Sequence, residues 1–340
     1  VERCEPEGSR SNSRTSRITP LVLGLALAAC SPVRADAPIT EQWRTVAVEA
    51  APVELGQARV GMLQFRGGLE LSSNDEAFGG WSGLEVLEDG RLIAVSDNGS
   101  WLSARLAFDQ SGALVGLGET RIAPMRDEDG QVFENKEAGD AEDLAQMQDG
   151  RFAVSFEQSQ TIRIYDLNRD GPFGAAMAGP ALAEVAGLPA NAGLEAMSAL
   201  ADGALLVGSE ESGLLWRAPL EAEAPAGPIS HYALELGYGL VSLDRLPGSD
   251  DVVALERFYA PVIGVRTRIA RIGVDSVEAA NADARVTEWA FLAPPLLLDN
   301  FEAISATRGP DGALRLYILS DDNFSAQQRT LLYAFDAALD

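Results

Sequence analysis

The sequence predicts an all-β chain folded as a single β-propeller with five blades. Three observations indicate this fold: one pattern occurs five times, apolar and polar residues alternate with a period of two around Asp-Gly turns, and nothing between the copies shows a sustained helical period. Such alternation is typical of antiparallel hairpins. Small antiparallel sheets repeated around an axis form a propeller.

Each copy of the pattern consists of a short apolar stretch, a turn, a β-rich run and a closing acid. Four copies have Asp-Gly at the turn, and the fifth has Gly248-Ser249-Asp250-Asp251 in its place. A second alternating run follows every copy, as in the stretch from Thr161 to Tyr165. The spacing therefore suits one four-stranded blade per copy. The copies begin at Ser82, Glu142, Glu195, Val241 and Glu302.

The two ends of the chain are expected to meet in the last blade. The last copy ends near Phe335 after three strands, and an unassigned strand from Arg59 to Leu71 precedes the first copy. That strand could complete the last blade, which would remove an exposed sheet edge. A six-bladed propeller remains the alternative, because residues 99–139 or 257–299 could hold a degenerate blade.

The N-terminal segment reads as an export leader. A basic stretch precedes the apolar residues Leu21–Ala29, which are too few to span a bilayer. Leu-Ala-Ala-Cys30 resembles a bacterial lipobox, so we expect Cys30 to be lipidated and the protein to be an outer-membrane lipoprotein on the periplasmic side. The alternative is cleavage after Ala37, which would give a soluble periplasmic protein. The expected segments are a lipoprotein-type signal peptide (1–29), a linker (30–58) and a propeller domain (59–340).

The charge of the chain excludes several classes of partner. Asp and Glu number 51 against 26 Lys and Arg, a net charge of −25, and Lys136 is the one lysine. Such a surface repels phosphate backbones, so we expect no nucleic-acid partner and no membrane contact except through a lipid anchor. It suits a small anionic substrate that is bridged to the protein by a metal ion. We expect the protein to be a monomer. His231 is the single histidine, which excludes paired-histidine zinc motifs.

The repeated acids predict a metal site at one mouth of the propeller channel. The acid that opens the first strand of a blade and the acid that closes the second lie on the same face. Eight carboxylates would then repel one another, and Ca²⁺ takes six to eight oxygen ligands. The alternative is that acids end strands because turns favour them. The opening acids are Glu142, Glu195 and Glu302, and the closing acids are Asp97, Glu157, Glu210, Glu256 and Asp321.

Roles within this cluster follow from chemistry. We expect Glu142, Glu195, Glu302, Asp97 and Asp321 to hold the metal, with Asn98, Asn300 and Asn323 as neutral oxygen donors. Catalytic roles fall to Glu157, Glu210, Glu256 and Arg257, since a free carboxylate can accept a proton beside a metal-polarised ester. For substrate binding we expect Asn300 and Arg329, the latter gripping an anionic group.

Four further residues leave alternatives open or are set aside. Arg257 and Arg329 could equally form ordinary salt bridges to the acids. Trp81 could present an aromatic wall to a ligand. A serine triad is not supported, because no G-x-S-x-G motif occurs and His231 reads as part of a strand.

Five stretches carry a resemblance to a known family. They begin at Gly79, Asp140, Asn191, Leu255 and Asp299, and the last, Asp299-NFEAIS…LYILSDDNFSAQQRTLLYAF, is the most specific. They resemble the bacterial phytase-like family described as "esterase-like activity of phytase", over roughly residues 60–336. The resemblance implies a propeller whose repeated acids, at the eight positions given above, form a hydrolytic site for phosphomonoesters or phosphodiesters. In the family a basic residue often follows the acid of the first blade, whereas Asn98-Gly99 follow Asp97 in this sequence. We therefore expect no phosphate binding at that position.

The sequence therefore predicts an exported, metal-dependent hydrolase of phosphate esters. The alternative from another class is a non-catalytic, Ca²⁺-stabilised propeller that serves as an envelope binding module. A lactonase-like metal propeller is a third possibility.

Overall fold

The computed structural model describes residues 43–337 apart from 184, 189–192, 222–224 and 278–281. The expected signal peptide, the lipidation site Cys30 and the alternative cleavage site after Ala37 lie outside the described residues. Within the described part of the chain, no helix is long and apolar enough to cross a membrane.

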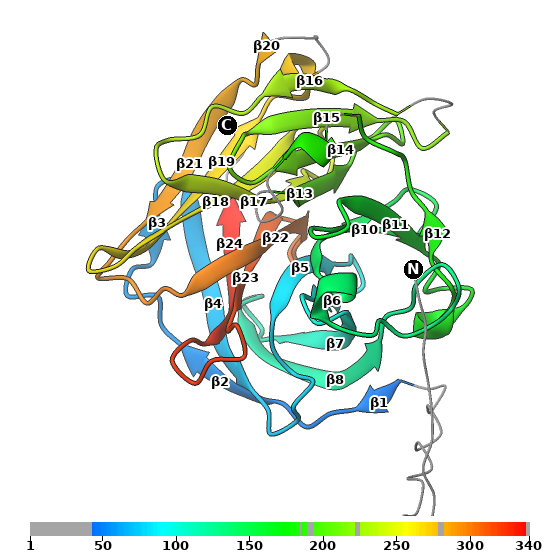
Figure 1. Cartoon of the computed structure of the whole chain (residues 1–340). Helices are drawn as coiled ribbons and strands as arrows, with labels where there is room; N and C mark the ends of the chain where they lie inside the picture. Colours follow the sequence, from blue (N-terminus) through cyan, green and yellow to red (C-terminus); the bar gives the residue numbers. More distant parts are fainter. Residues whose placement is uncertain (1–42, 184, 189–192, 222–224, 278–281, 338–340) are drawn as a thin grey trace, which may run out of the picture. The chain divides into compact units, whose positions relative to one another are not determined.

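Five sheets follow one another along residues 41–340 and form the five predicted blades (Figure 1). Blade 1 contains β5 (Trp81–Val86), β6 (Arg91–Ser96), β7 (Ser100–Phe108), β8 (Leu114–Pro124) and, at its edge, β1 (Arg44–Thr45). Blade 2 contains β9 (Ala141–Gln146), β10 (Phe152–Phe156), β11 (Thr161–Tyr165) and β12 (Met177–Ala178). Blade 3 contains β13 (Leu194–Ala199), β14 (Leu205–Ser209), β15 (Leu214–Ala218), β16 (Pro228–His231) and β20 (Ala282–Asp283).

The remaining two blades follow the same order from the inner strand outward. Blade 4 contains β17 (Tyr238–Arg245), β18 (Val252–Ala260), β19 (Gly264–Ile272) and β21 (Val286–Leu292). Blade 5 contains β22 (Asn300–Arg308), β23 (Leu314–Asp321), β24 (Thr330–Ala337), β4 (Leu63–Ser72) and β2 (Glu49–Val53), with β3 (Arg59–Val60) paired to β4. Helical structure is confined to α1 (Lys136–Gly139), η1 (Gly171–Phe173), η2 (Val185–Gly187) and η3 (Val274–Ser276) among the described residues.

The fold is held by apolar clusters between the blades. Each cluster combines side chains of two neighbouring blades, as where Val95 and Trp101 of blade 1 meet Leu144 and Phe156 of blade 2. Such burial is the main favourable term in folding. The described part of each of the four other interfaces has a cluster of the same kind. The inner strands β5, β9, β13, β17 and β22 consequently lie side by side around the centre.

The ring closes as the sequence predicts. Strand β4 pairs antiparallel with β24, so the first long strand completes the last blade. Part of the expected linker 30–58 belongs to the folded body, because β1 pairs with β8, β2 pairs with β4, and Leu55 is fully buried. The two connectors that could have held a sixth blade instead supply strands of blades 1, 3 and 4. His231 ends strand β16, as expected.

A circle of hydrogen bonds, here called the channel girdle, ties the inner strands together. Buried side chains on four of these strands accept backbone N–H groups of another inner strand, and the circle runs from blade to blade until it returns to blade 1. These links satisfy buried groups that would otherwise be costly to desolvate. The pairs, at 2.5 to 3.2 Å, are Glu85 with Gln146, Asp143 with Met197 and Leu243, Asp244 with Ala306, and Ser305 with Val86.

Candidate functional site

Every inner strand has a β-bulge close to its N-terminal end. The ladder of each inner strand shifts register at the place where the sequence put the opening acids. A bulge breaks the regular alternation and re-aims a side chain, and bulges are frequent beside active sites. The five bulges thus present equivalent residues at the same end of the channel. The residues at the bulges are Ser82, Glu142 with Asp143, Glu195, Val241 and Glu302.

The second strand of each blade returns to this end. The backbone N–H of the closing acid donates to the carbonyl of the residue just before the inner strand, for Asp97 to Gly80 at 2.8 Å and for Glu157 to Asp140 at 3.0 Å. The opening and closing acids of one blade are therefore neighbours, as predicted.

Blade 4 differs from the prediction, because Arg257 and not Glu256 occupies the closing position. Asp321 of blade 5 pairs with Asn300, and the matching pair in blade 4 is Arg257 with Gly239. Glu256 is one residue too early, and a one-residue shift turns a side chain to the other face.

Glu256 consequently lies away from the other acids. Its carboxylate is fully buried, accepts a hydrogen bond from the Tyr232 hydroxyl at 2.7 Å and is paired with Arg268 at 2.9 Å. Burial raises its pKa against the effects of both partners. These contacts assign Glu256 a structural part in blade 4.

Eight carboxylates do gather at the mouth, with Asp140 in place of Glu256. We call them the mouth cluster. Seven of them each influence the pKa of another member through their charge, and four of those raise the pKa of the eighth, Glu195. These effects link the acids of blades 1, 2, 3 and 5. The members are Asp97, Asp140, Glu142, Glu157, Glu195, Glu210, Glu302 and Asp321.

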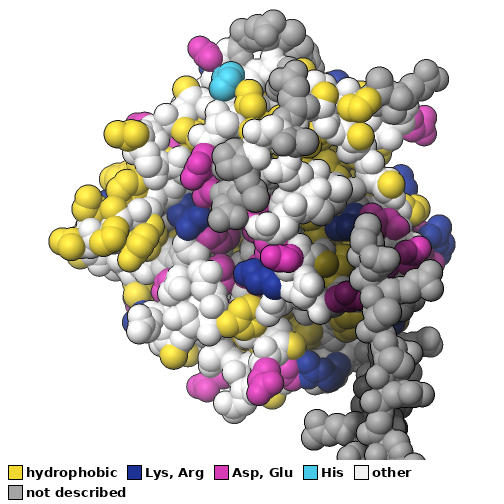
Figure 2. Space-filling model, in the orientation of Figure 1, with side chains coloured by type: hydrophobic (Ala, Val, Ile, Leu, Met, Phe, Trp, Pro, Cys, Tyr) yellow, Lys and Arg dark blue, Asp and Glu magenta, His cyan; other side chains and the backbone are white. Residues whose placement is uncertain are grey.

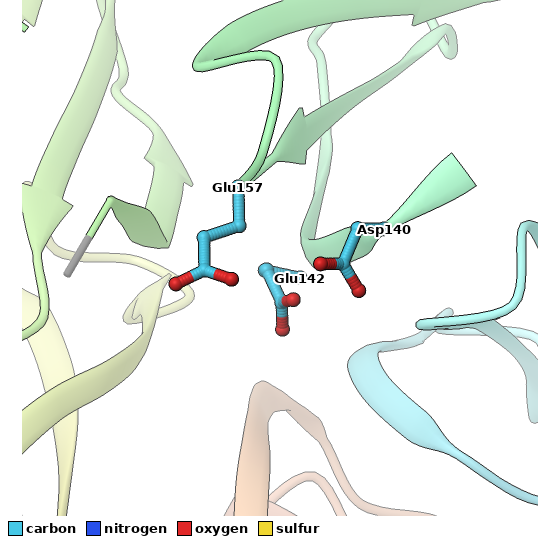
Figure 3. Close-up of side chains that lie close together, drawn as sticks. All are labelled: Asp140, Glu142 and Glu157. Atoms are coloured by element: carbon cyan, nitrogen blue, oxygen red, sulfur yellow. The ribbon is translucent and has the colours of Figure 1, made fainter. Parts of the chain in front are cut away.

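Three members form the tightest group, all in blade 2. Asp140, Glu142 and Glu157 each offer a carboxylate oxygen, and these oxygens lie within 4.8 Å of one another. Figure 3 shows the three carboxylates converging from the start of β9 and the end of β10. Three oxygens at this separation fit the ligand set of a hard divalent cation.

Burial and mutual repulsion oppose ionisation of the carboxylates in the mouth cluster. Burial is the main cause that raises the pKa of Asp140 to about 6, of Asp321 to about 7 and of Glu302 to about 8. Burial, reinforced by neighbouring carboxylates, raises the pKa of Glu142 and Glu195 well above the ordinary value. Such groups bind either protons or a cation, so the residues fit a metal ion.

Lys136 is a member of the site that sequence reasoning missed. It stands on α1, a single turn capped by the Asn135 side chain, which accepts from the Ala138 N–H at 3.0 Å. Its ammonium group is paired with Asp97 and lies 3.9 Å from an oxygen of Asp140. The signal in the sequence was that the only lysine stands four residues before Asp140.

Arg257 is the second cation of the mouth. Its guanidinium contacts Glu210 at 2.9 Å, Glu302 at 3.1 Å and the Asn300 side-chain oxygen at 3.0 Å. Asn300 in turn donates to Glu302 at 2.7 Å. The alternative of a salt bridge to the acids thus describes Arg257 in this structure, although its side chain keeps 26% of its surface exposed.

A cavity of about 560 Å³ opens beside this arginine. Arg257, Asn300, Glu302 and Asn323 line it, so two predicted substrate or catalytic residues face the same space. Arg329 does not line this cavity. Its backbone N–H donates to Asp299, and it lines a separate hollow near Asp322 and Phe324.

Two other sequence candidates lie elsewhere. Asn98 is exposed in the turn between β6 and β7. Trp81 is fully buried against Phe78, with ring centroids 5.5 Å apart, and presents no wall to a ligand.

Comparisons with known proteins agree with the repeat pattern. A family model described as "Phytase-like: Esterase-like activity of phytase" matches residues 76–324. No curated protein sequence matches the chain.

The chain is also similar in fold to several solved structures at low sequence identity. One is of a protein assigned as a gluconolactonase, with 16% identity and a TM-score of 0.45 over 87% of this chain and 90% of that one. Another is virginiamycin B lyase from Staphylococcus aureus, a catalytically inactive variant with quinupristin, with 10% identity and a TM-score of 0.42 over 86% of this chain and 100% of that one. The interpretation of the site rests on the residues of this chain.

Proposed function

The chain belongs to the phytase-like family, and we propose on that basis that it is a hydrolase that cleaves phosphate esters at the mouth cluster. The family description supports ester hydrolysis as the reaction class. The expected export, periplasmic location and lipid anchor at Cys30 remain part of the proposal.

The observation that supports a phosphate ester as the substrate is that two cations are paired with the carboxylates of the mouth. Lys136 stands on one side of the triad Asp140, Glu142 and Glu157, and Arg257 stands in the blade-4 position of the mouth. A purely acidic mouth would repel an anionic substrate. Two fixed cations in a partly buried site can each form charge-assisted hydrogen bonds to a phosphate oxygen.

The triad is the proposed cation site, and Ca²⁺ suits its all-oxygen ligands. A divalent cation held there would polarise a phosphoryl oxygen and acidify a bound water. The raised pKa values of Asp140 and Glu142 are consistent with carboxylates that are stabilised when a cation is present.

The residues of the chain take the remaining roles. Arg257 orients the anionic oxygens of the ester through its planar, fixed set of donors. Glu302 lines the cavity, and burial raises its pKa to about 8, which favours the protonated form near neutral pH. A protonated carboxyl beside the cavity can donate to the leaving alkoxide, which is general acid catalysis.

The experiment is a substrate survey with matched variants. Phosphomonoesters, phosphodiesters, carboxyl esters and lactones are assayed with Ca²⁺ and with EDTA. We expect phosphate-ester turnover that needs Ca²⁺ and falls about a hundred-fold in Glu142→Gln and in Glu302→Gln, while Glu288→Gln, a half-exposed acid outside the cluster, keeps full activity.

Two results would contradict the proposal. Turnover of carboxyl esters or lactones alone would replace phosphate as the substrate class. No turnover in any class, together with stabilisation by Ca²⁺, would favour the non-catalytic binding propeller.

A further inference from the structure

An exposed apolar hairpin projects beside the cavity at the mouth. Strands β18 and β19 run to residues 260 and 264, and the turn between them carries Val262 and Ile263, which are 106% and 52% exposed. Figure 2 shows apolar side chains gathered on one projection of the surface, at the left of the view, where Figure 1 places the end of the hairpin. Apolar side chains grouped in this way on a surface usually contact something.

The same hairpin supplies one wall of the cavity. Residues two apart on a strand share a face, so Tyr259 projects on the same side of β18 as Arg257. Tyr259 pairs across the hairpin with Val265, and both line the cavity. Tyr259 is 63% exposed, which leaves its ring free to stack on a bound group.

The opposite lining is polar and offers hydrogen bonds. Its side chains are amides and a hydroxyl in the segment after β23, together with Asp299 and with Asn300 and Glu302 of β22. The cavity thus has an aromatic face, a hydrogen-bonding face and a charged end at Arg257. The amides and hydroxyl are Asn323, Ser325, Gln327 and Gln328.

We propose that this cavity is the leaving-group subsite and that it selects esters whose alcohol half is a flat-faced ring, an aryl or pyranosyl group, over open-chain alcohols. The inference rests on the proposed function. A ring can lie against Tyr259 and turn its polar edge to the amides, and aromatic contacts of this kind prefer defined stacked or edge-on geometries. An open-chain alcohol such as glycerol lacks a face for Tyr259.

Binding of non-hydrolysable probes tests the subsite without turnover. Phenylphosphonate and methylphosphonate are titrated by calorimetry in the presence of Ca²⁺. We expect phenylphosphonate to bind about ten-fold more tightly. Tyr259→Ser is expected to bring this ratio close to one, and Tyr259→Phe to keep it. Val115→Ser removes an exposed apolar side chain in blade 1 and is expected to leave the ratio unchanged.

A second pair of ligands separates the two kinds of ring. Glucose 1-phosphate that binds more tightly than glycerol 3-phosphate, with a loss in Tyr259→Ser, identifies a pyranosyl group, and a preference confined to phenylphosphonate identifies an aryl group. Equal affinities for ring and open-chain ligands, or no binding of any, would overturn the proposal.

Two more outcomes distinguish the ring subsite from the proposed hydrolase function and from a membrane contact of the hairpin. If the phenyl preference is present but no ester is hydrolysed, the ring subsite stands and the hydrolase falls. If Tyr259→Ser and Val262→Ser abolish flotation with phosphatidylcholine–phosphatidylglycerol vesicles and leave the phosphonate ratio unchanged, the hairpin contacts a membrane and the subsite is refuted.

Discussion

Replacing Arg257 by glutamine is expected to destabilise the protein by about 3 kcal/mol at pH 8 and by about 1 kcal/mol at pH 5. In the native protein the guanidinium lies 2.9 Å from Glu210 and 3.1 Å from Glu302. An opposite charge at roughly 4 Å contributes about 4 kcal/mol at an effective dielectric constant of 20. The side chains keep 13% to 26% of their surface exposed, so we take the lower end of the cost of breaking a buried pair.

The pH dependence follows from the direction of the pKa shifts. The folded pKa of Glu302 is about 8, above its ordinary value of 4.5, so its stabilising protonated state is complete below pH 4.5 and is lost as pH rises through 8. Arg257 lowers this pKa, and removal of the arginine raises it further. At pH 5 Glu302 is protonated in both proteins, so the loss is limited to the pairing of Arg257 with Glu210 and to hydrogen bonds.

Thermal and urea unfolding in EDTA at the two pH values measure the effect. The folded unit 41–340 has 300 residues, so a loss of 3 kcal/mol lowers Tm by about 5 °C at an unfolding entropy of about 2.1 cal/mol/K per residue. Arg271→Gln removes an ion pair to Asp251 in the same blade in which the arginine side chain is 44% exposed. It is the matched control, with an expected loss below about 1 kcal/mol at both pH values. Equal losses for Arg257→Gln at pH 5 and pH 8 would refute the reasoning.

Three other outcomes are expected. The raised carboxyl pKa values, such as that of Glu302, oppose ionisation, so Tm in EDTA is expected to fall between pH 5 and pH 8. Ca²⁺ is expected to raise Tm more at pH 8 than at pH 5. Calorimetry that shows the same increase in Tm at both pH values would contradict a cation at the mouth. Asp143→Ala orphans two N–H groups of the channel girdle and lowers the unfolding free energy by about 3 kcal/mol, and an unchanged urea midpoint would contradict that role. Gly80→Ala places a methyl group against Asp97 at a φ of +65° and is expected to weaken Ca²⁺ binding in calorimetry. Gly203→Ala, with a φ of +90° and open space around it, is expected to lower only the unfolding free energy, by about 1 kcal/mol. Equal effects of the two variants on Ca²⁺ binding would show that backbone strain alone acts.

The repeat pattern was sufficient to predict the fold from the sequence. The five copies, their turns and the strand from Arg59 to Leu71 predict the blades and the closure, because a period of two and Asp-Gly turns constrain hairpins strongly. The bulges were not predictable in this way. A bulge is a register shift between two strands, and no single residue type marks it, although the five bulges decide where Glu142 and Glu302 point.

The site was predicted in part, and the errors have a common cause. In blade 4 the repeat pattern predicts Glu256 at the closing position, and only the pairing of β17 with β18 shows that Arg257 occupies it. Lys136 comes from the connection before β9, whose path over Asp97 depends on packing between blades. Local patterns carry the strand content of such a protein, whereas contacts made by connections depend on the tertiary arrangement.

The pairing of β4 with β24 has a consequence for how the protein comes into being. Residues 63–72 can pair locally with β2 and β3, but blade 5 is complete only after residues 330–337 have been synthesised. Bringing such distant segments together carries a loop-closure penalty and slows folding. During synthesis the ring therefore stays open until β24 has emerged, and a chain without β24 would leave β4 without its main partner.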